Sequence, residues 1–181
     1  MHGKEELRPG GPISKRELLL LDIRRLYSKA NESYEKWDGI KDMQSILGRG
    51  LARLRAEVRD FRDDAVETYF EALELYLKGI YQLKLARDLV AKVEQSGSPH
   101  HLKYESLKGA VEGPLKKARG CLCDSSLSGS MRRELEGRYG ALHTTVVLYL
   151  HELERLADGK PRIYTLPSSL GRRKTEGVGL R

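Results

Sequence analysis

Residues 51–80 read LARLRAEVRDFRDDAVETYFEALELYLKGI. Between Gly50 and Gly79 this stretch contains no glycine or proline, the two residues that interrupt helices most strongly. Its apolar residues recur at steps of three and four, which places them on one face of an amphipathic helix. They are Leu51, Leu54, Val58, Phe61, Ala65, Tyr69, Ala72, Tyr76 and Ile80. That face must be buried, either against the same chain or against a partner.

The composition favours an all-α protein. Of 181 residues, 39% are hydrophobic, 33% are charged and only 7% are aromatic, a balance typical of solvated helices rather than of a sandwich or barrel. The longest apolar runs, 18–21 and 146–150, are far shorter than the ~20 residues that cross a bilayer, so we expect no membrane span. Residues 1–13 lack the apolar stretch of a secretory signal. We therefore expect a disordered leader and a cytoplasmic protein.

Caps and breakers divide residues 14–159 into an antiparallel bundle of four main helices. Ser14 and Glu17 match a capping box, in which each side chain satisfies a backbone N–H at the start of a helix. Turn-forming Ser, Gly and Pro residues separate the later helices. The predicted helices cover about residues 14–38, 42–94, 100–122 and 131–157.

The second predicted helix is unusually long. If it is unbroken over 42–94, it measures about 70 Å or more at ~1.5 Å per residue, which is rare in a compact domain. The alternative is a break near residue 63, where Asp63 and Asp64 would supply the cap and a first-turn acid of a new helix. The sequence leaves both open. It also leaves open whether this helix pairs within the chain or across the twofold axis of a homodimer.

Positive charge is concentrated at the C-terminal end. The net charge is +7, and residues 160–181 hold six bases and one acid, or +5, which leaves +2 for the preceding 159 residues. We expect a flexible tail that contacts a polyanion such as nucleic acid, an acidic protein face or a lipid surface. The bases expected there are Arg162, Arg172, Arg173 and Lys174. An apolar island in the same tail is a candidate linear motif for a partner's groove, through Ile163, Tyr164 and Leu166.

One stretch resembles a known family. Residues 69–80, YFEALELYLKGI, match every position of Tyr-x-x-Ala-Leu-x-Leu-Tyr-x-x-Gly-aliphatic, the pattern of the second helix of the microtubule interacting and trafficking (MIT) domain. Residues 107–122 are similar to the third helix of that family. The resemblance, over 64–122, implies a non-enzymatic module that takes a partner's short helix or extended peptide beside these helices, as in ESCRT-type trafficking. The partner-binding residues would be Tyr76, Ile80, Val111 and Leu115.

Small residues in this stretch also predict close helix packing. Ala72 and Gly79 would let neighbouring helices approach, a role that small residues have in many bundles. The sequence departs from the family where Gly113 and Pro114 interrupt the third helix, since proline there either kinks the helix or divides it.

An enzymatic alternative rests on Arg138 and His143. Their Arg-x4-His spacing resembles the active site of HEPN-type ribonucleases, in which the histidine would act as general acid or base and the arginine would hold the phosphate. Cys121 and Cys123 make only half of a structural zinc pattern, so we expect no metal and no cofactor. The sequence therefore predicts a non-enzymatic interaction or scaffold module. Nucleic-acid binding through the tail is the alternative, and the ribonuclease is third.

Overall fold

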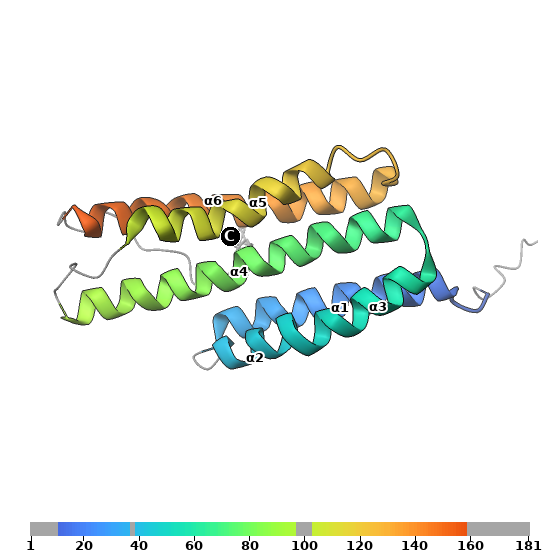
Figure 1. The fold of residues 1–181 in the computed structure, drawn as a ribbon, viewed down its shortest axis with the longest axis horizontal. Coiled ribbons are helices and arrows are strands. Elements are labelled where there is room, and N and C mark those ends of the chain that lie inside the picture. Colours follow the sequence, from blue (N-terminus) through green and yellow to red (C-terminus); the bar gives the residue numbers. More distant parts are fainter. Residues whose placement is uncertain (1–10, 37–38, 97–102, 159–181) are drawn as a thin grey trace, which may run out of the picture.

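The computed structural model describes residues 11–36, 39–96 and 103–158, and the regular elements in these ranges are all helical (Figure 1). A π-helical turn, Ile46–Gly50, joins α2 (Gly39–Ser45) to α3 (Leu51–Phe61) without a gap. The α-helices are α1 (Lys15–Glu35), α2 (Gly39–Ser45), α3 (Leu51–Phe61), α4 (Asp64–Ser96), α5 (Tyr104–Cys121) and α6 (Gly129–Ala157). The all-α prediction is confirmed for the described residues. None of these helices combines the length and apolarity that crossing a bilayer requires.

Helix α4 lies at the centre of the fold. Its 33 residues span about 50 Å. It contacts α1, α2 and α3 on one side and α5 and α6 on the other, and consecutive rods of the chain reverse direction (Figure 1). The result is three layers: α1 with α2 and α3, then α4 alone, then α5 with α6.

The long second helix of the sequence prediction is two rods in the structure. Residues 39–61 form the α2–α3 rod, and α4 begins after a two-residue corner at Arg62 and Asp63. Arg62 has φ 53° and ψ 49°, the left-handed conformation that ends a helix. The Asp63 carboxylate accepts the backbone N–H of Val66 at 3.1 Å and Arg16 Nε at 2.9 Å. The unbroken helix is therefore wrong and the break near residue 63 is correct, so the described chain has five rods rather than four.

Arg62 is a natural position for glycine, and we expect Arg62→Gly to raise the free energy of unfolding by about 0.5–1 kcal/mol. A left-handed conformation costs a side-chain-bearing residue roughly 1–2 kcal/mol, part of which glycine loses again through its freer unfolded state. Urea unfolding measures the change. The matched control is Arg59→Gly, an exposed position inside α3, where the same replacement should destabilise by about 1 kcal/mol. Equal effects at the two positions would contradict the left-handed corner.

The apolar stripe of residues 51–80 faces the core, with one exception. Leu51, Leu54 and Val58 of α3 are buried, as are the four stripe residues of α4 from Tyr69 to Ile80. Phe61 is 36% exposed, because α3 ends there and the chain turns away. The close approach expected at Gly79 is present: a Cβ atom at this position would lie 3.2 Å from Leu115 Cδ2.

Two charged side chains of α4 donate hydrogen bonds to backbone carbonyl oxygens at the C-terminal end of α1. α1 has no basic residue in its own last turn. Lys84 Nζ instead donates to the carbonyl oxygen of Lys36 at 3.3 Å, and Arg87 Nη1 donates to that of Tyr34 at 3.1 Å. Cations at this end also complement the helix dipole. At the other end of α1, the predicted capping box of Ser14 and Glu17 is present.

Candidate functional site

A charged cluster joins three helices around Glu134 of α6. Arg24 of α1 donates to its carboxylate through Nη2 at 3.0 Å and Nε at 3.2 Å. The Tyr69 hydroxyl of α4 donates to Oε1 at 2.8 Å. Arg138, one turn further along α6, donates to the same oxygen through Nη2 at 3.1 Å. The carboxylate thus ties α1, α4 and α6 together.

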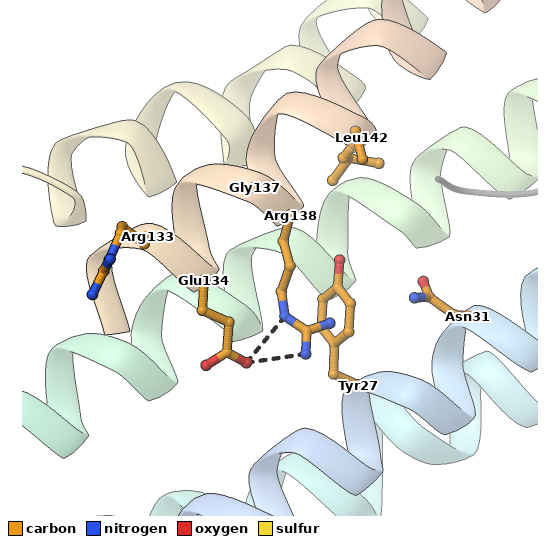
Figure 2. A pocket seen from close by; sticks show the side chains of 8 residues that line it. Tyr27, Asn31, Arg133, Glu134, Gly137, Arg138 and Leu142 are labelled. Atoms are coloured by element: carbon orange, nitrogen blue, oxygen red, sulfur yellow. Dashed lines mark hydrogen bonds and ion pairs between the residues drawn. The ribbon is translucent and has the colours of Figure 1, made fainter. Parts of the chain in front are cut away.

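This cluster borders a cleft between α1 and α6 of about 430 Å³. Figure 2 shows Arg138 reaching from α6 towards Glu134 and lying beside the ring of Tyr27, with its guanidinium carbon 4.4 Å from the ring centroid. Asn31 extends from α1 towards the same space, whereas Arg133 is directed away from it. Because Arg138 of α6 hydrogen-bonds Glu134 and packs on the ring of Tyr27 of α1, its side chain connects the two sides of the cleft.

The environment of Glu134 keeps it ionised. Burial raises the pKa of its carboxyl group, but the hydrogen bonds from Arg24, Tyr69 and Arg138 together outweigh burial, and the net pKa is lowered. A carboxylate held this way accepts hydrogen bonds and has no proton to donate near neutral pH. The ionised carboxylate therefore serves as the shared acceptor that joins the three helices.

The burial of Tyr27 is expected to make the protein less stable at alkaline pH. Burial raises its pKa to about 12, against the opposing effect of Arg138. The unfolded chain loses the tyrosine proton near pH 10 and the folded chain near pH 12, so stability falls as pH rises through this window. Between pH 8 and pH 11 we expect the free energy of unfolding to fall by about 1.4 kcal/mol less in Tyr27→Phe than in the wild type. Urea unfolding of both proteins at the two pH values measures it, and parallel pH profiles would contradict it.

A second hollow, of about 150 Å³, runs between α5 and α6 on the outer layer. Its lining includes Leu115 of α5 and Val146 of α6, both buried. Val147, also in the lining, is 50% exposed. Tyr139 and His143 stack at its α6 edge, with ring centroids 5.6 Å apart and planes at 24°. We call this hollow the α5–α6 groove.

The α5 edge of the groove is charged. Lys116 and Arg119 line it together with Glu112, and the Lys116 side chain is 79% exposed. Lys116 Nζ lies 3.9 Å from Glu112 Oε2, a long and solvated ion pair. Arg119 makes no ion pair within residues 11–36, 39–96 and 103–158. The groove therefore combines an apolar floor with a positively charged edge.

The structure does not bring Arg138 and His143 together. The two residues are five positions apart on α6, about 140° around the helix. Arg138 lines the α1–α6 cleft and His143 lines the α5–α6 groove. With Nε and Nη2 of Arg138 directed at Glu134, the pair does not form one site in this arrangement.

The residues expected to bind a partner beside α4 and α5 lie in the protein core. Tyr76 and Ile80 are 0% exposed, Val111 is 1% exposed and Leu115 is 3% exposed. The Tyr76 hydroxyl donates to the carbonyl oxygen of Leu135 at 3.0 Å. Leu115 in turn packs against Gly79 of α4, and all four side chains are buried and not open to a partner here. Of the four, Leu115 also borders the α5–α6 groove.

The candidate residues of the tail lie outside the described residues. These are Ile163, Tyr164 and Leu166 of the apolar island and Arg162, Arg172, Arg173 and Lys174 of the basic set. Cys121 is half-buried and Cys123 is exposed, and both thiols are free.

The sequence analysis did not predict a binding groove at Val147. The signal was present, since Val147 lies one position off the buried stripe of α6 and extends an apolar run beyond what the core needs. Lys116 and Arg119 carried no comparable signal, because exposed bases at helical spacing are common.

Comparison of the chain with family models, with curated proteins and with solved structures found no match in any of the three.

Proposed function

We propose that this protein is a non-enzymatic interaction module that holds a short segment of a partner protein in the α5–α6 groove. The observation that carries the proposal is Val147, a half-exposed valine above the buried Leu115 and Val146. A partner's aliphatic side chain placed there would remove apolar surface from water on both molecules, at roughly 25 cal/mol per Å².

The size and lining of the groove support a peptide rather than a small molecule. Its volume of about 150 Å³ is below the roughly 300–1,000 Å³ of typical small-ligand pockets. A strip with an apolar floor, an aromatic edge and a charged edge suits the anchor side chains of an amphipathic helix or an extended segment. The resemblance to the MIT family supports the same class of function, with the binding surface moved from the α4–α5 side to the α5–α6 side.

The first test is Val147→Asp. We expect it to weaken binding of peptides selected on the wild-type chain from a displayed random library by at least tenfold, because a carboxylate would replace the anchor contact. The affinity of each selected peptide is measured by fluorescence anisotropy. Leu18→Asp is the matched control, since Leu18 is 48% exposed on α1, away from the groove. Equal loss in both variants, or no loss in Val147→Asp, would refute the proposal.

A further inference from the structure

Charges of opposite sign lie towards the two ends of the α5–α6 groove. Leu115 and Leu142 both approach Gly79, so they lie level with each other on the antiparallel α5 and α6. Arg119, one turn after Leu115 on α5, is level with Tyr139 of α6. Glu112, one turn before Leu115, is level with Val146 of α6. The groove therefore has the base Arg119 at its Tyr139 end, and at its other end the exposed Val147 lies near Glu112, which pairs with Lys116.

Positive charge prevails at the Arg119 end of the groove. The lining contains one lysine, Lys116, one arginine, Arg119, and one acid, Glu112. Glu112 pairs with Lys116, which leaves Arg119 without a counter-charge among the described residues. Tyr139 and Val147 are eight positions apart on α6, a rise of about 12 Å.

We propose that the segment bound in this groove is an acidic one, with an aliphatic anchor at Val147 and one or two carboxylates at Lys116 and Arg119. This inference rests on the proposed function and adds the chemistry and orientation of the partner. The anchor and a carboxylate at Arg119 are about 12 Å apart, which corresponds to about eight residues of a helix or four of an extended chain. Arg119 offers a planar donor pair to a carboxylate.

Nucleic acid fits the groove less well than an acidic protein segment. Two bases neutralise few phosphates, so the affinity for a polyanion would be weak and would fall steeply with salt. The exposed valine would contribute nothing to such a complex, whereas a peptide uses both ends of the groove.

The experiment is a charge swap on the full chain. Peptides selected from the displayed library on wild type are expected to carry Asp or Glu at the stated spacing from an aliphatic residue. The double variant Lys116→Glu/Arg119→Glu should bind them at least tenfold more weakly. Replacing their acids with Lys should restore binding to the variant. That rescue separates an electrostatic contact from damage to the fold, and circular dichroism checks helicity.

The control is Lys92→Glu/Lys117→Glu, which makes the same charge change at two exposed positions outside the groove lining. It should retain affinity within about twofold. If the groove variant binds the peptides unchanged while Val147→Asp abolishes binding, the acidic partner is wrong and the proposed function stands. If Val147→Asp also binds unchanged, both are wrong. A 20-nucleotide single strand that binds wild type and Val147→Asp equally, and fails to bind the groove variant, would show a polyanion site and overturn the inference.

Discussion

Replacing Glu134 with alanine is expected to lower the free energy of unfolding by about 2–3 kcal/mol. Removing one partner of a fully buried ion pair costs roughly 3–5 kcal/mol, because the other charge is left without compensation. Here two guanidinium groups lose their partner, but Arg24 and Arg138 are 37% and 26% exposed at the side chain, and water offsets part of the cost. The Tyr69 hydroxyl loses its acceptor as well.

The effect of Glu134→Ala should depend on pH in one direction. Because the folded pKa of Glu134 is lowered, its contribution is present above the unfolded value near 4.3 and is lost as pH falls through the folded value. Urea unfolding at pH 7 and at pH 3 measures the difference. Glu57→Ala is the control: its pair with Arg53 spans 3.5 Å between largely exposed side chains, and its loss should cost less than about 0.5 kcal/mol. Similar costs for Glu134 and Glu57 would contradict the cluster's role.

The second large effect is expected at Gly79, where leucine should destabilise the protein by about 2–3 kcal/mol. A Cβ atom alone would lie 3.2 Å from Leu115 Cδ2 and 3.9 Å from Leu142 Cδ2. The remaining side-chain atoms would push α5 and α6 away from α4, and overpacking of this kind typically costs 1–3 kcal/mol. The higher helix propensity of leucine recovers less than 1 kcal/mol of this.

Gly140→Leu is the matched control for the packing at Gly79. It lies on α6, where a Cβ atom would have no neighbour within 4 Å among the described residues, so the propensity gain should remain and stabilise the protein by about 0.5–1 kcal/mol. Thermal unfolding of both variants gives the comparison. A Gly79→Leu protein as stable as Gly140→Leu would mean that α4 and α5 do not approach closely at this point.

Features that depend on neighbouring residues in the chain were predictable. The capping box at Ser14 and the corner at Asp63 involve side chains that satisfy backbone N–H groups within three residues, so their chemistry is visible in the sequence. The apolar stripe indicated the inward face of each rod for the same reason. Gly79 fits this pattern too, since a small residue on a buried face indicates a close neighbour.

Features that depend on packing between distant segments were not predictable. Arg24 and Glu134 are 110 positions apart, and nothing in the local pattern pairs one arginine with one glutamate among many. Periodicity shows that Tyr76 and Val111 point inward, but it does not show whether a partner or the chain itself covers them. In the structure Tyr76 packs against Leu135 and Tyr139 of α6, and both Tyr76 and Val111 are buried within the chain itself.

The position of α4 between the two outer layers limits how this protein can be divided. One face of α4 meets α1 through Tyr69, Lys84 and Arg87, and the other meets α5 and α6 through Tyr76 and Gly79. A fragment starting at residue 64 would keep the groove but expose the first of these faces to solvent. The groove therefore cannot be transferred by itself. Grafting it onto another scaffold would require including α1, α2 and α3 as well, or redesigning the face of α4 that these helices cover.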